Sequence, residues 1–208
     1  MAAGCPNFTA IGMLPTSLSL LERARTRADN AAWERLVQVY RPWILGWLCR
    51  HGLPHSDAED LTQEILLVVM RELPHFQHNE RPGAFRNWLR KIIVHRLQDF
   101  LRSQRYRPQP GGDSALRQSL DQLEDPGSVL SRHWDREHDR HVVRRLLALL
   151  EPDFQETTWQ AFRGVMLNGE TPAAVAARLG ISVNAVLLAK SRILARLRQD
   201  GRAILDTE

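Results

Sequence analysis

Apolar residues recur at helical spacing along most of the chain. Between Ala32 and Cys49 the large apolar side chains fall three and four positions apart, which predicts one helix with a broad buried face. These side chains are Trp33, Leu36, Val37, Tyr40, Trp43, Ile44, Trp47 and Leu48. Pro42 can bend this helix without ending it. A shorter helix is expected just before it, over residues 18–28.

Two more helices are predicted on either side of a polar loop at 75–83. The first starts at Ser56, which forms a capping box with Glu59, and it stops at Pro74. The second extends from about residue 84 to 103. Its apolar face consists of Phe85, Trp88, Leu89, Ile92, Ile93, Leu97 and Phe100. Its basic residues fall largely elsewhere on the helix, which predicts one packed face and one cationic face.

Proline and glycine clusters then break regular structure, so residues 104–131 are predicted to form a linker. Leu116, Leu120 and Leu123 could form one turn of helix within it. Two further helices follow, at about 132–150 and 153–167.

The C-terminal pattern predicts a helix-turn-helix. Thr171 and Pro172 suit a helix start, and Gly180 suits the left-handed residue that ends that helix. Ser182 caps a second helix over 183–199. Two helices joined by a short turn with glycine are the layout of this motif, and a plain helical hairpin is the alternative.

No strand pattern competes with these helices, so the predicted fold class is all-α. We expect two small helical domains joined by a flexible linker. They comprise residues 16–103 and 132–208, and the second contains the helix-turn-helix. Residues 1–15 are expected to be a flexible leader and make a poor signal peptide, because they contain no Lys or Arg.

Composition excludes several classes of protein. The chain has 208 residues, 43% hydrophobic and 25% charged, which excludes a wholly disordered chain and a disulfide-dense mini-protein. Cys5 and Cys49 have no metal-binding spacing, which suits a reducing cytoplasm and predicts a cytoplasmic protein. No apolar stretch is long enough to cross a bilayer, so no membrane insertion is expected.

Basic residues are segregated along the chain. Residues 81–107 contain eight basic residues and one acid, and residues 178–202 contain six basic residues and one acid. Residues 110–139, between these blocks, contain seven acids and three arginines. Two basic blocks on patterned helices indicate two contacts with a polyanion. Solvated helix faces are the alternative for either block.

Three segments resemble region 2 of the sigma-70 family of RNA polymerase sigma factors. They are Asp57-Ala58-Glu59-Asp60-Leu61-Thr62-Gln63-Glu64-Ile65, Trp88-Leu89-Arg90-Lys91-Ile92-Ile93-Val94-His95 and Asp99-Phe100-Leu101-Arg102. The helix-turn-helix resembles region 4 of the same family, and a short chain with only a linker between the two resembles the extracytoplasmic-function (ECF) group. The resemblance covers about residues 17–103 and 132–202.

The resemblance implies a polymerase-binding face and a site for the −10 promoter element. Asp60, Gln63 and Glu64 match the acidic motif that docks on the clamp helices of the largest polymerase subunit; charge complementing the helix dipole is the alternative. The implied −10 contacts are Arg86, Arg90, Lys91, His95, Arg96, Arg102, Phe76 and His78. For the Phe76 ring, a core position that closes the loop is the alternative.

The resemblance also implies recognition of the −35 element by the second helix of the motif. The implied contacts are Asn184, Leu187, Lys190, Ser191 and Arg192. Relatives often have Gly-Thr-Val-Lys-Ser-Arg where this chain has Asn184-Ala185-Val186-Leu187-Leu188-Ala189. This departure predicts weaker, shifted or more apolar −35 recognition, for example through thymine methyl groups. Alternatively, Leu187 and Leu188 contact a partner protein.

The sequence therefore predicts a sigma factor that binds core RNA polymerase and promoter DNA, recognises the −10 element and helps to open DNA. The acidic linker would enter polymerase channels, and an anti-sigma factor is a candidate partner. No catalytic constellation is visible, so neither an enzyme nor a cofactor is expected. His138 and His141 with nearby aspartates do not form a clear metal site and are expected at the surface. The alternatives are a one-component helix-turn-helix regulator and a helical protein-binding adaptor.

Overall fold

The computed structural model describes residues 19–26, 29–77, 83–103, 120–202 and 204. Within these ranges the regular structure is helical and no strand occurs, which confirms the all-α prediction. The predicted leader, His78 and Leu116 lie outside the described residues.

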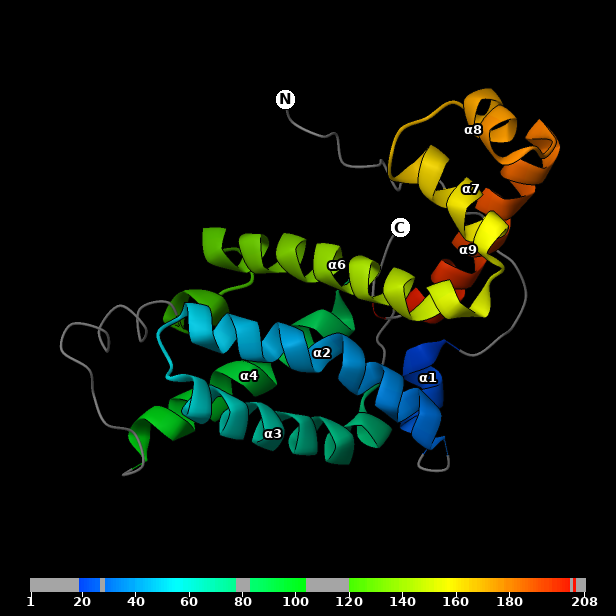
Figure 1. Cartoon of the computed structure of the whole chain (residues 1–208). Coiled ribbons are helices and arrows are strands. Elements are labelled where there is room, and N and C mark those ends of the chain that lie inside the picture. The colour runs from blue at the N-terminus through cyan, green and yellow to red at the C-terminus, as the bar shows by residue number, and fades with distance from the viewer. Residues whose placement is uncertain (1–18, 27–28, 78–82, 104–119, 203, 205–208) are drawn as a thin grey trace.

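The described residues of the N-terminal half form four α-helices. Of these, α2 contacts α1 and α3, and α3 contacts α4 (Figure 1). They are α1 (Leu20–Arg25), α2 (Asn30–Arg50), α3 (His55–Glu72) and α4 (Ala84–Arg102), with a short 3-10 turn, η1 (Leu73–His75), after α3. As predicted, α2 continues through Pro42. The predicted capping box on α3 is wrong, because the helix begins one residue before Ser56, with Pro54 at its N-cap and no side-chain cap.

The C-terminal half begins with a long helix. The elements are α6 (Val129–Leu150), the 3-10 turn η2 (Glu151–Asp153), α7 (Glu156–Met166), α8 (Pro172–Leu179) and α9 (Val183–Gly201). α6 starts earlier than predicted because the Ser128 side chain accepts a hydrogen bond from the Ser131 backbone N–H at 2.9 Å.

Part of the predicted linker packs on the protein core. Residues 120–124 are helical, and the Leu120 and Leu123 side chains are buried in the main apolar cluster. The Gln98 amide on α4 also donates to the Glu124 carboxylate at 2.6 Å. The segment that leads into α6 is therefore attached to α4 rather than free.

The two halves of the chain share an apolar cluster where α6 lies along α2 (Figure 1). Trp134 of α6 packs edge-on against Trp43 and Trp47 of α2, with ring centroids 5.3 and 5.1 Å apart. α1 also contacts α9. The helices that carry the two predicted DNA sites, α4 and α9, therefore belong to one packed body in this structure. The division into domains at 16–103 and 132–208 stays a prediction.

Candidate nucleic-acid and polymerase interfaces

The predicted polymerase-binding residues lie on an accessible part of α3. Asp60 and Gln63 are exposed and Glu64 is half-buried. Leu67 and Met70 continue this face one and two turns later and are 60% and 47% exposed. The surface thus combines carboxylates with large apolar side chains, and it fits a helical partner that is cationic and partly apolar.

Sequence reasoning missed Leu67 and Met70. The buried residues of α3 lie on a different stripe, at Ala58, Leu61, Thr62, Ile65 and Val69. The signal was present in the spacing, because Leu67 and Met70 follow Asp60 and Gln63 by seven residues each.

The predicted −10 residues of α4 fall into two groups. Lys91, His95 and Arg102 are exposed and share one face, because they are spaced by four and seven residues. Arg96 is partly exposed and pairs with Asp99 at 2.6 Å. These four side chains are accessible to solvent, and their contact with DNA stays a prediction.

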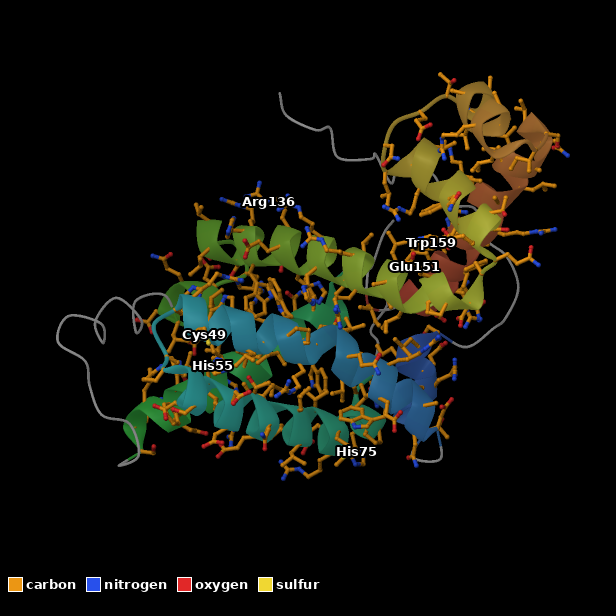
Figure 2. The ribbon with its side chains drawn as sticks, in the orientation of Figure 1. Cys49, His55, His75, Arg136, Glu151 and Trp159 are labelled. Carbon is orange, nitrogen blue, oxygen red and sulfur yellow. The ribbon has the colours of Figure 1, made fainter. Side chains whose placement is uncertain are left out.

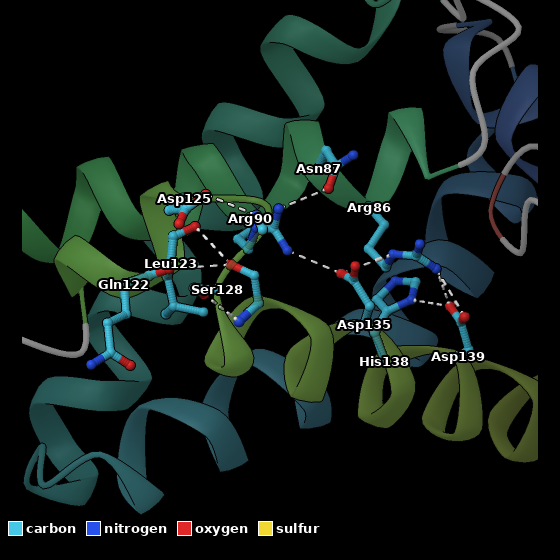
Figure 3. A network of polar contacts seen from close by, with 12 residues as sticks. Arg86, Asn87, Arg90, Gln122, Leu123, Asp125, Ser128, Asp135, His138 and Asp139 are labelled. Atoms are coloured by element: carbon cyan, nitrogen blue, oxygen red, sulfur yellow. Dashed lines mark hydrogen bonds and ion pairs between the residues drawn. The ribbon is translucent and has the colours of Figure 1, made fainter.

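Arg86 and Arg90 instead contact α6, so the prediction that they lie on an open cationic face is wrong. The Arg86 Nη1 atom donates to both Asp139 carboxylate oxygens, at 2.7 and 2.8 Å (Figure 3). The Arg90 Nη1 atom donates to Asp135 Oδ1 at 3.0 Å, and the Arg90 side chain is only 3% exposed. Helical periodicity could not reveal this arrangement, because the two carboxylates come from residues 45 to 53 positions away.

The four partners form a network of opposite charges. Asp135 Oδ1 lies 3.0 Å from Arg86 Nε as well as from Arg90, and Asn87 accepts a bond from Arg90 Nη2 at 2.9 Å. Burial lowers the pKa of Arg90, and the negative charge of Asp135 opposes this shift. The guanidinium stays protonated, as guanidinium groups do in proteins. Burial raises the pKa of Asp139, but the hydrogen bond from His138 and the charge of Arg86 outweigh it, and the pKa is lowered. Asp139 is therefore a carboxylate.

Phe76 is 7% exposed and packs against Phe85 and Trp88, with centroids 5.7 and 5.0 Å apart. This packing favours the structural alternative for its ring over stacking with a base. His75 is exposed beside it.

The prediction that His138 and His141 lie at the surface is wrong. His138 is fully buried, with Nε2 3.0 Å from the Tyr40 hydroxyl and Nδ1 2.9 Å from Asp139. Its burial lowers its pKa. His141 is half-buried and donates from Nε2 to the Val39 carbonyl at 2.8 Å. In the part of the chain that the structure describes, no group of three or more His, Cys, Asp or Glu residues is arranged to hold a metal ion.

Pro42 creates part of the α2–α6 contact. Proline has no backbone N–H, so the carbonyl four residues earlier, at Gln38, lacks its helical donor. The Arg145 guanidinium of α6 donates to this carbonyl instead, at 3.0 and 3.3 Å. Sequence reasoning considered Pro42 only as a bend, because the residue that uses the released carbonyl lies more than 100 positions away.

The capping predictions for the C-terminal helix pair are confirmed. The Thr171 side chain accepts from the Ala174 N–H at 3.2 Å, and that of Ser182 from the Ala185 N–H at 3.1 Å. Gly180 adopts the left-handed conformation between them, with φ 66° and ψ 32°. The two helices are bent by 107°, which lies in the usual range for a helix-turn-helix.

The first turns of α9 present the predicted −35 residues to solvent. Asn184, Ser191 and Arg192 are exposed, whereas Lys190 is half-buried. Leu187 and Leu188 are each 47% exposed on the same part of the helix. The exposed surface thus combines one amide, one hydroxyl, one guanidinium and two large apolar side chains.

A row of exposed arginines on α6 was missed by sequence reasoning. Arg132, Arg136, Arg140 and Arg144 are four residues apart, and none forms an ion pair with another described residue. Figure 2 shows Arg136 pointing away from α2. In a linear charge count, the acids between these arginines cancel them, and only the four-residue spacing reveals the row.

Comparison with known proteins gives one family match and several relatives. Residues 36–107, from within α2 to just beyond α4, match Sigma-70 region 2. The ECF RNA polymerase sigma factor SigE of Mycolicibacterium smegmatis is 30% identical over 88 residues, which are 42% of this chain and 33% of that protein. The ECF RNA polymerase sigma factor RpoE of Cereibacter sphaeroides is 26% identical over 182 residues, 88% of this chain and 93% of that protein.

A third relative is the probable RNA polymerase sigma factor RfaY of Xanthomonas campestris, 27% identical over 150 residues, which are 72% of this chain and 35% of that protein. The matches thus span about a third of SigE and of RfaY, and most of RpoE. Residues 36–107, about a third of the chain, are thus similar to region 2 of the sigma-70 family. Two of the relatives, SigE and RpoE, are assigned to the ECF group by name.

No single helix among the described residues has the length and apolar content needed to cross a membrane.

Proposed function

We propose that this protein is an RNA polymerase sigma factor, which binds core polymerase and directs it to a class of promoters. The proposal rests on the agreement between a family match and two surfaces in α2–α4. The residues that match Sigma-70 region 2 are also those that present an acidic and apolar face on α3 and a cationic face on α4.

Core polymerase binds through Asp60, Gln63 and Glu64 of α3, on the clamp helices of the largest subunit. The accessible carboxylates steer a cationic partner towards this face, and Leu67 and Met70 provide apolar area that a partner would bury.

The −10 element is recognised as a single strand on the accessible face of α4. Lys91, Arg96 and Arg102 supply cations for the backbone, and His95 supplies a hydrogen-bonding ring for a base. Because a single strand binds better than a duplex to such a face, this binding helps to open the DNA.

The −35 element is recognised by the first turns of α9. Asn184 reaches a base edge, Arg192 binds phosphate, and Leu187 contacts thymine methyl groups. Lys190 and Ser191 provide further polar contacts.

Capture of core RNA polymerase by the tagged full chain tests the polymerase contact. The double variant Asp60→Arg/Glu64→Arg should lose at least about tenfold in affinity, because two attractive charges become repulsive. The control Glu34→Arg/Asp121→Arg makes the same change of charge at exposed positions on other elements and should bind as the wild type does. Equal capture of the α3 variant and the control would show that α3 is not the polymerase face, and loss of capture by both would point to net charge alone.

A further inference from the structure

We propose that the arginine row on α6 binds the phosphate backbone of duplex DNA, in the promoter segment between the −10 and −35 elements. The row consists of Arg132, Arg136, Arg140 and Arg144. Its place on a promoter rests on the proposed function, whereas its affinity for duplex DNA does not. The row is a third DNA surface beside those of α4 and α9, and it adds affinity without reading bases.

The row carries four charges, none of which pairs with an acid in the described part of the chain. α6 contains three acidic residues, and each is already engaged elsewhere. Asp135 and Asp139 pair with arginines of α4 (Figure 3), and Glu137 pairs with Arg50 of α2. Like charges four residues apart on a helix repel each other, so the row destabilises α6. An anionic partner along the row removes this repulsion.

The composition of this surface favours a nucleic acid over a protein. Between residues 131 and 147 the exposed side chains of α6 are the four arginines and His133, and no large apolar side chain is exposed among them. A protein interface has an apolar core, which Leu67 and Met70 provide on α3 but nothing provides on this face of α6. All four cations are arginines, whose planar N–H donors bind phosphate oxygens in pairs.

The form of the row favours a duplex over a single strand. Single strands bind where bases stack on aromatic side chains, and residues 131–147 of α6 contain no exposed Phe, Tyr or Trp. Twelve residues of helix make the row about 18 Å long, which corresponds to about five base pairs of duplex. Over this length both the helix and the duplex are stiff, so the cations follow the backbone without ordering it first.

The place of α6 in the fold and in the chain points to the segment between the two promoter elements. α6 contacts α9, and α8 lies on the side of α6 away from α2 (Figure 1). Arg136 points to this same side (Figure 2). In the chain, α6 stands between α4, with the proposed −10 contacts, and α9, with the proposed −35 contacts. A duplex held at α9 by its −35 element therefore continues along the arginine row towards the −10 element.

The test measures binding of the full chain to a fluorescein-labelled duplex of about 25 base pairs by fluorescence anisotropy at several salt concentrations. The variant Arg136→Gln/Arg140→Gln removes two charges from the middle of the row and keeps good helix formers there. It should bind at least about tenfold more weakly than the wild type at about 100 mM salt. The log–log salt slope should fall by about 1.8, because each lost phosphate contact removes about 0.9. A second duplex of unrelated sequence should lose the same factor, because phosphates carry no sequence information.

The control is Arg41→Gln/Arg71→Gln, which makes the same change of net charge at exposed positions of α2 and α3. It should bind within about twofold of the wild type, and equal binding by the glutamine variant of the row and this control would overturn the inference. Arg136→Lys/Arg140→Lys keeps the charge and should recover most of the lost affinity and slope. If circular dichroism shows that the double glutamine variant has lost helix, Arg136→Gln alone replaces it, with half the change in slope.

Two further measurements distinguish the row from other sites and from the proposed function. Binding to a single strand of twenty thymidines should weaken less than about threefold in the double glutamine variant, and a loss equal to that for the duplex would overturn the choice of duplex DNA. Capture of core RNA polymerase by this variant should equal capture by the wild type, and lost capture would assign the row to polymerase instead. A wild type that captures no polymerase but binds duplex through the row would overturn the sigma function and leave the duplex contact standing.

The place of the contact on a promoter is tested with the holoenzyme. Hydroxyl-radical footprinting should show protection of about five base pairs next to the −35 element, on the side of the −10 element. The double glutamine variant of the row should lose this protection and keep that of both elements. Protection that is absent in the wild type, or unchanged in the variant, would overturn the placement between the elements.

Discussion

The two helices proposed to read DNA differ in what their cations already contact. On α4, Arg86 and Arg90 bind carboxylates from α6, and Arg90 is almost completely buried. On α9, Arg192 and Asn184 are exposed and make no ion pair or hydrogen bond through their side chains to another described residue. Both helices lie in basic stretches of the sequence. Charge density along a chain therefore does not tell whether a given cation is available to a partner.

Removing an arginine from each helix should show the largest difference in the free energy of unfolding. Arg90→Ala should lower the free energy of unfolding by about 2–3 kcal/mol, because it removes a charged hydrogen bond from a buried site. Arg192→Ala should change it by less than about 0.5 kcal/mol, because the side chain is exposed. Urea unfolding of both variants measures the difference. Similar values for the two variants would mean that the buried network contributes nothing.

The next effect concerns DNA preference on α9. Asn184→Ala should relax the preference at one position of the −35 element, at a cost of about 1–3 kcal/mol for the preferred base. Arg192→Ala should weaken binding to all sequences alike and reduce the salt slope by about 0.9. Binding of the holoenzyme to a set of single-base promoter variants distinguishes the two outcomes. If both variants change only the overall affinity, α9 contacts the backbone and does not read bases.

A smaller effect follows from pH. Burial lowers the pKa of His138 below its ordinary value of 6.5, so the unfolded chain binds the proton more readily than the folded chain does. The free energy of unfolding should therefore fall as the pH is lowered through about 6.5. The pKa values of His51 and His141 are also lowered by burial and act in the same direction. Urea unfolding at pH 7.5 and 5.5 checks this, and stability that rises on acidification would contradict it.

The smallest effect is expected at Pro42. Pro42→Ala restores a backbone N–H that can bond to the Gln38 carbonyl and so compete with Arg145. Amides of α6 should then exchange with solvent about three- to fivefold faster, while those of α3 keep their rates. Unchanged exchange in α6 would show that the released carbonyl does not help to hold this helix.

Local patterns predicted the helices well because each depends on residues close in sequence. The α8–α9 turn follows from Thr171, Gly180 and Ser182, whose side chains or backbone act within three or four positions. The one capping error, at Ser56, arose because Pro54 lets the helix begin earlier.

The contacts between the two halves could not be predicted in the same way. A charge count treats Asp135 and Asp139 as part of an acidic stretch and Arg86 and Arg90 as part of a basic one. Only the packing of α6 along α2 brings them together. That packing depends on Trp134 meeting Trp43 and Trp47 across about 90 residues, which no local pattern encodes.

Transcription with purified components tests the central claim most directly. Core RNA polymerase is supplied with a genomic promoter library and the full chain, and run-off transcripts are sequenced. The account predicts discrete transcripts that need both the polymerase and the chain and that disappear with Asp60→Arg/Glu64→Arg. Transcripts that are the same without the chain, or sequence-specific binding of the chain to duplex DNA in the absence of polymerase, would contradict it.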